Sequence, residues 1–72
     1  MTEVRSRMVA TVRHVVVGPG ASVGAGDPIL FVESMKMALP VNADRAGRIA
    51  AIRVSPGDEI REGDVLAILE DP

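Results

Sequence analysis

The chain has 72 residues, of which 47% are hydrophobic, a formal net charge of −2, and no cysteine, tryptophan or tyrosine. A chain of this length forms one small domain and leaves no room for a separate catalytic domain. The slightly acidic balance argues against nucleic acid, whose binding needs clustered positive charge, and the absence of cysteine excludes disulfides and thiolate chemistry.

The beginning of the chain predicts a polar segment followed by strands. Residues 1–7 are mostly polar, and we expect them to form a flexible segment ahead of a domain over residues 8–70. Residues 8–17 are dense in β-branched side chains, which favour strands, and predict two short strands with a bend near Arg13. Gly18-Pro19-Gly20 then ends this stretch.

The middle of the chain predicts a hairpin. Residues 29–33 form a nearly continuous apolar run, which is typical of a strand inside a two-sheet sandwich. A second strand is expected over residues 37–41, so that Met35 and Lys36 form the tip. A tight two-residue tip normally requires Asn-Gly or Asp-Gly, which tolerate positive φ. The tip is therefore the one place where local turn chemistry disagrees with the strand pattern, as functional or strained sites tend to do.

The remaining strands lie in the second half of the chain. Residues 47–54 predict a strand with Ile49, Val54, and Ala51 or Ile52 as core candidates. Residues 65–69 are apolar and predict the last strand. No stretch has the capped periodic pattern of a helix.

The second half repeats the first at an offset of 37 residues. Laying residues 15–33 over residues 52–70 gives six identities in nineteen positions, four of them proline, glycine or aspartate at turns. Two such units predict a closed sandwich with quasi-twofold symmetry, because each half can cover the apolar face of the other. The position equivalent to Lys36 would be 73, beyond the last residue. We therefore expect the tip to project from the end of the domain opposite both termini.

Lys36 is the only lysine, whereas arginine fills the other seven basic positions. An exposed lysine is ordinarily a solubilising charge, but this one is unique and lies on a predicted tip between two methionines. Lysine suits a tether because its neutral amine is a nucleophile on a long stem, and acylation converts it to a neutral amide. Arginine stays protonated in proteins and could not serve. Lys36 is thus the candidate site of covalent modification.

The residues around Lys36 are candidates for recognition by a partner enzyme. Met35 and Met37 offer adaptable contact surface, although they could also be turn and strand filler. Glu33 could equally be a solvent-facing strand residue, since Glu70 occupies the equivalent position of the repeat. The candidate recognition residues are Glu33, Ser34, Met35 and Met37.

The rest of the chain offers no catalytic constellation. His14 is the only histidine, and no nucleophile or second metal ligand lies near it in the sequence, so we expect a structural or exposed histidine. No paired acid, base, nucleophile or metal cluster is present. An enzyme in its own right is the least supported function.

The stretch Glu33-Ser34-Met35-Lys36-Met37 resembles the Glu-Ala-Met-Lys-Met attachment sequence of biotinyl domains, the carboxyl carrier modules of biotin-dependent carboxylases. The Gly-Asp and Pro-Gly turns and the final strand also fit the biotinyl/lipoyl pattern, over about residues 8–70. Lipoyl domains typically have Asp-Lys-Ala at the tip, which matches neither flank of Lys36. Two positions depart from the family: Ala38 stands where an acidic residue is usual, and Ala43-Asp44 stands where Ala-Pro is usual.

The resemblance implies an all-β barrel-sandwich hybrid, a flattened barrel of two small antiparallel sheets with quasi-twofold symmetry and Lys36 on a hairpin tip. It also implies a biotin carboxyl carrier that is not itself an enzyme. A biotin protein ligase would attach biotin to Lys36, and the carrier would shuttle a carboxyl group between biotin carboxylase and carboxyltransferase subunits.

Two alternatives stay open: a lipoyl group on the same lysine, and an unmodified interaction module. The chain begins without the apolar core of a signal peptide and contains no run of about 20 apolar residues. We therefore expect a short, free-standing, monomeric biotinyl domain in the cytoplasm, with no nucleic-acid or membrane partner.

Overall fold

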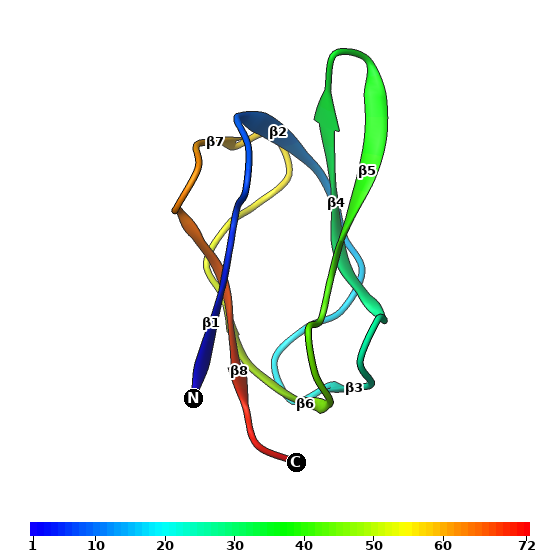
Figure 1. Ribbon diagram of the computed structural model, residues 1–72, viewed down its shortest axis with the longest axis vertical. Coiled ribbons are helices and arrows are strands. Elements are labelled where there is room, and N and C mark those ends of the chain that lie inside the picture. Colours follow the sequence, from blue (N-terminus) through cyan, green and yellow to red (C-terminus); the bar gives the residue numbers. More distant parts are fainter.

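The computed structural model describes residues 1–72 and contains eight strands and no helix. The strands are β1 (Thr2–Arg5), β2 (Ala10–Val15), β3 (Ser22–Val23), β4 (Pro28–Ser34), β5 (Met37–Asn42), β6 (Gly47–Ile52), β7 (Glu59–Ile60) and β8 (Val65–Glu70). They form two antiparallel sheets, with strand orders β1-β8-β6-β3 and β5-β4-β2-β7 (Figure 1). The predicted all-β barrel of two small sheets is confirmed. The structure contains no helix that could span a membrane.

A single apolar core lies between the two sheets. Successive side chains of a strand point to opposite faces, so each sheet presents one apolar face inward. Fully burying one such aliphatic side chain contributes about 1.5–3 kcal/mol, which is substantial for so small a domain. Ile49 is buried as predicted, and Ile52 and Val54 pack partly buried against the core. The buried cluster consists of Ala10, Val12, Val23, Ile29, Leu30, Val32, Ala43, Ile49, Ile60, Leu66, Ala67 and Leu69.

The predicted internal repeat is visible in the sheets. Strands β2 and β6, β3 and β7, and β4 and β8 each start 37 residues apart, and corresponding strands take the same place in the two sheet orders. The turns match as well. The backbone N–H of Gly24 donates to Asp27 Oδ2 at 2.8 Å, and the N–H of Arg61 donates to Asp64 Oδ2 at 2.8 Å. The quasi-twofold symmetry predicted from the sequence is thus confirmed.

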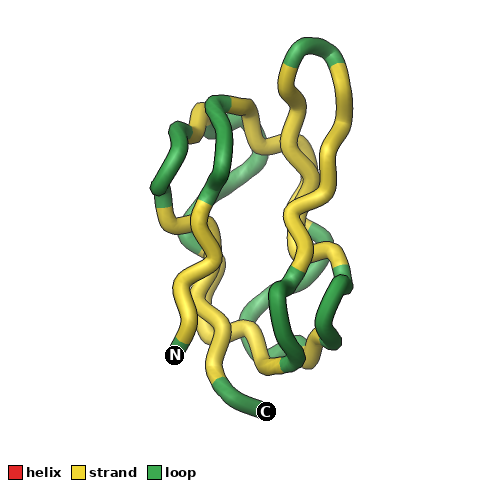
Figure 2. The backbone as a smooth tube through the Cα atoms, viewed as in Figure 1, coloured by secondary structure: helices red, strands yellow, loops and turns green.

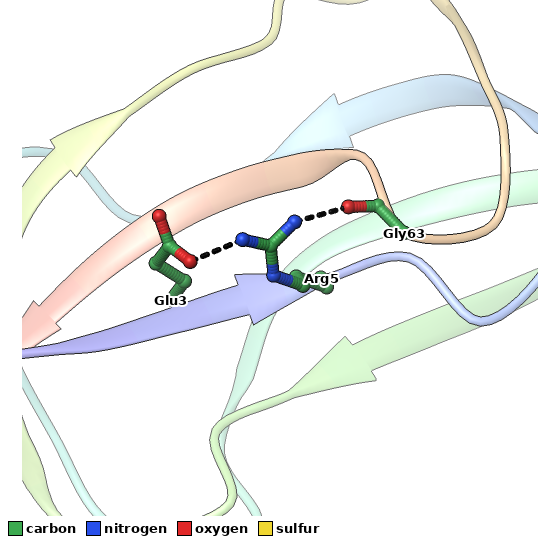
Figure 3. Close-up of polar contacts among 3 residues, drawn as sticks. All are labelled: Glu3, Arg5 and Gly63. Atoms are coloured by element: carbon green, nitrogen blue, oxygen red, sulfur yellow. Dashed lines mark hydrogen bonds and ion pairs between the residues drawn. The ribbon is translucent and has the colours of Figure 1, made fainter.

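The N-terminal residues depart from the predicted flexible segment over residues 1–7. Strand β1 pairs antiparallel with β8 from Thr2 to Arg5. Arg5 donates a hydrogen bond to the carbonyl oxygen of Gly63 at 2.6 Å and forms an ion pair with Glu3 (Figure 3). Ser6 is buried, and its carbonyl oxygen accepts a bond from the Gly63 N–H at 2.8 Å. The ordered domain therefore starts at residue 2 and not at residue 8.

The physical reason for this correction is the position of β1 at the edge of its sheet. Edge strands have one row of backbone N–H and C=O groups without a neighbouring strand and carry charged residues that prevent pairing with other chains, so their composition resembles that of a loop. Strand β1 is the repeat counterpart of β5 and completes a sheet that would otherwise have three strands. Two-residue strand β7 was also absent from the sequence prediction.

Candidate functional site

The tip of the β4–β5 hairpin consists of Met35 and Lys36. Ser34 and Met37 form the last pair of the two strands, which leaves only these two residues to turn the chain. Their φ angles are 52° and 64°, and they are the only non-glycine residues with positive φ. Two positive φ values match a type I′ turn, which suits the right-handed twist of a hairpin. The predicted conflict between sequence and turn geometry is therefore confirmed.

This tip is held away from the body of the barrel. Figure 2 shows the β4–β5 hairpin extending beyond the other loops at its end of the molecule. Both termini lie at the opposite end, as the repeat predicted (Figure 1). Lys36 is exposed, and the side chains beside it are exposed as well, Met35 to 92% and Met37 to 60%. A partner enzyme can therefore reach the amine and both methionines together.

Glu33 lies on the outer face of the sheet, just below the tip. It is directly opposite Ala38 on β5 and opposite Thr11 on β2. Its carboxylate accepts a bond from Arg13 at 2.5 Å, in a pair whose side chains are about half and one third exposed. An exposed pair of this kind contributes about 0.2–1 kcal/mol, so it orients Glu33 more than it stabilises the fold.

The pairing of Glu33 with Ala38 shows what alanine does at this position. An acidic side chain at that position would lie directly across from Glu33, and like charges in directly opposed positions destabilise a sheet. With alanine there, Glu33 faces no repulsion from β5 and pairs with Arg13. Ser34, the fourth candidate recognition residue, is half-buried at the end of β4.

A shallow pocket of about 330 Å³ lies beside Lys36, and sequence reasoning did not identify it. It is formed by side chains from β2, β4 and β5, which the sheet order makes neighbours. A sequence signal was present, because Phe31 is the only phenylalanine in a chain without tryptophan or tyrosine and yet is not part of the buried core. The lining residues are Arg13, His14, Phe31, Glu33, Lys36 and Ala38.

The strained tip gives a stability prediction. Met35→Asn is expected to raise the free energy of unfolding by about 1 kcal/mol, because asparagine tolerates the left-handed region that costs other side chains about 1–2 kcal/mol. Met35 is 92% exposed, so the substitution removes no core packing. Urea unfolding measures the change. Met37→Asn is the matched control, because Met37 has no positive φ and should gain nothing; an equal gain in both variants would contradict tip strain.

Residues 2–69 match the family of biotin/lipoyl domains described as "Biotin-requiring enzyme". The chain belongs to the biotin/lipoyl attachment family. A member from Mycobacterium leprae, named as a biotinylated protein TB7.3 homolog, is 45% identical over 67 residues, which cover 93% of this chain and 94% of that protein. The resemblance inferred from the tip sequence is thus confirmed at the level of the family.

Solved structures of the family confirm the architecture. A single-chain, multi-domain long-chain acyl-CoA carboxylase contains a region with a TM-score of 0.90 and 30% identity, over 99% of this chain and 7% of that one. The lipoyl domain of the 2-oxoglutarate dehydrogenase complex from Azotobacter vinelandii has a TM-score of 0.74 and 30% identity, over 88% of this chain and 80% of that domain. The proteins similar to this chain thus include one named as biotinylated and one named as a lipoyl domain.

Proposed function

We propose that this protein is a biotin carboxyl carrier and that Lys36 is the residue to which biotin is attached. The observation that carries the proposal is the placement of the chain's single lysine on an exposed two-residue tip. Met35 and Met37 flank it in the order of the biotinyl attachment sequence. A ligase therefore meets one side-chain amine, with contact surface on either side.

The residues of the tip fit covalent attachment of biotin. Lys36 Nζ is the nucleophile that can form an amide with the carboxyl group of biotin, and no other side chain of this protein can. Glu33, Ser34, Met35 and Met37 are the recognition residues in this proposal. Bound biotin supplies a ring nitrogen that can take up and give up a carboxyl group.

The protein's own contribution is display and transport. Strands β4 and β5 are paired along their lengths, from Pro28 and Asn42 up to Ser34 and Met37, so the tip stands on a firm hairpin. A tethered group is present at high effective concentration at whichever active site the carrier visits. The carrier would serve biotin carboxylase and carboxyltransferase subunits as a cytoplasmic monomer and would make no bonds itself.

Two observations support biotin over the lipoyl group. The Mycobacterium leprae relative is named as a biotinylated protein. The tip sequence favours the same choice, because Met-Lys-Met differs on both sides from Asp-Lys-Ala. Lipoylation of Lys36 is the second candidate, favoured by the shared fold of the lipoyl domain.

Intact mass after co-expression with a biotin protein ligase tests the proposal. We expect the whole population to gain the mass of one biotinyl group, because the chain has one lysine. Peptide mapping should place the added mass on the tip peptide. An unmodified mass in the presence of active ligase and biotin would refute the carrier function. A lipoyl mass in protein purified from its host, without streptavidin binding, would replace biotin by the second candidate.

A further inference from the structure

The pocket beside Lys36 contains a group of side chains that the proposed carrier function does not use. Phe31, the only phenylalanine in a chain without tryptophan or tyrosine, lines it on the outer face of the sheet. Arg13 and His14 line it from β2 and are both exposed. Lys36 lines the same pocket, so the modified side chain and these residues share one space.

A β-bulge places two consecutive polar residues on this face. The pairing of β2 with β4 shifts register between Val12 and His14, so that Arg13 is the extra residue. Successive residues normally point to opposite faces, but a bulge breaks this alternation and re-aims a side chain. Arg13 and His14 are both lining residues of the pocket for this reason.

The internal repeat shows what the fold alone requires at these positions. The pairing of β6 with β8 has the same register shift, between Ile49 and Ala51. Adding 37 to each number places Ala50 and Ala51 at the positions equivalent to Arg13 and His14. Alanine therefore satisfies this bulge in the half of the protein without a tip. The fold does not need the long polar side chains found in the other half.

Phe31 likewise has an aliphatic counterpart in the other half of the repeat. Its repeat counterpart is Ile68, which is half-buried as Phe31 is. Glu33 and Glu70, by contrast, are identical in the two halves, and each pairs with an arginine. The two halves thus differ in the aromatic ring of Phe31 and the imidazole of His14, which the half without a tip lacks. They also differ in the position of the arginine that pairs with the glutamate, which is Arg13 at the bulge in one half and Arg48 in the other.

We propose, on the basis of the carrier function proposed above, that this pocket is a resting site for the ring group carried by Lys36. Phe31 provides an apolar face for the sulfur-containing ring, since thioether sulfur contacts aromatic rings favourably. Arg13 has five N–H donors, and its pair with Glu33 leaves others for the ring carbonyl oxygen. His14 offers a further ring N–H on the same side.

The modified Lys36 side chain is long and covalently attached, so weak binding is sufficient to occupy the pocket. Phe31 lies three residues before Ser34 on β4, or about 10 Å along the strand. A lysine stem extended by the acyl chain of biotin is long enough to fold back over that distance. A short tether gives an effective concentration in the millimolar range, so even a site of millimolar affinity is about half occupied. The group would be sheltered between visits to the two active sites and still be free to leave.

Nuclear magnetic resonance of the full chain tests this inference. Phe31 and His14 supply every aromatic side-chain signal of this protein, so contacts to them are assigned without ambiguity. Intact mass is measured first, because an unmodified protein refutes the carrier function itself. In biotinylated protein we expect nuclear Overhauser cross-peaks between the biotin ring protons and the Phe31 ring, and shifts of the Phe31 and His14 ring signals relative to unmodified protein.

The variant Arg13→Ala/His14→Ala provides the matched comparison. It copies the alanines of the second half, so the fold should tolerate it, and the cross-peaks to Phe31 should be lost or strongly weakened. The control Arg48→Ala removes an exposed arginine from the other sheet and should leave them unchanged. Biotinylated protein whose only shifted signals come from Met35, Lys36 and Met37, with no cross-peak to Phe31, would overturn the resting site while leaving the carrier function intact.

Discussion

Replacing Lys36 by arginine is expected to abolish biotinylation and leave the fold unchanged. The guanidinium keeps the positive charge but lacks a nucleophilic amine, and the chain has no second lysine. Lys36 is exposed on the tip, so the free energy of unfolding should change by no more than about 0.5 kcal/mol. Intact mass and streptavidin binding measure the loss, and urea unfolding verifies the fold.

A variant that carries its single lysine at another position tests whether biotinylation requires the tip. Lys36→Arg/Arg61→Lys keeps one lysine per chain but moves it to the exposed turn between β7 and β8. That turn is not the two-residue tip of a protruding hairpin, and no methionine flanks it. The double variant should remain unmodified. Biotin on the relocated lysine, at the rate seen for the original tip, would show that a unique lysine is sufficient and that the tip is not required.

The sequence predicts the strands most clearly where apolar runs meet turn residues. Strands β4 and β8 combine β-branched residues with glycine, proline or aspartate where they begin, and both signals are local. The repeat adds a long-range constraint, because two copies of one supersecondary unit must cover each other. Edge strand β1 has no apolar run and no glycine, proline or aspartate at its ends. Its pairing with β8 depends on residues 60 or more positions away.

The candidate site also has one part that the sequence predicts and one part that it does not. Lys36 and its strained tip could be predicted because both depend on adjacent residues. The neighbouring pocket could not, because it requires the register of β2 against β4 and the bulge at Arg13. The sequence predicted a bend near Arg13, but which face each side chain occupies at a bulge depends on the pairing with the partner strand. Phe31 was the one visible sign, because it is a bulky aromatic residue in a chain whose buried core is entirely aliphatic.

Gly47→Ala is expected to cause a large loss of stability. A Cβ atom at this position would lie 2.5 Å from the carbonyl oxygen of Glu70 and 2.9 Å from Leu69 Cγ. A side chain can rotate away from such a contact, but the backbone oxygen of a paired strand cannot. Overpacking of this kind costs about 1–3 kcal/mol or more, and we expect about 3 kcal/mol here. The midpoint of urea unfolding should fall accordingly.

Gly18→Ala is the matched control and should act in the opposite direction. Nothing lies within 4 Å of the Cβ position at Gly18, and its φ is not positive. Alanine there mainly restricts the unfolded chain, which raises the free energy of unfolding by about 0.4–1 kcal/mol. The repeat explains in part why position 47 has no room for a methyl group. The counterparts of Gly47 and Leu69 in the other half are Ala10 and the smaller Val32. Equal effects of the two substitutions would mean that β6 and β8 separate enough to admit a methyl group, and that their close approach does not set the stability of this half of the barrel.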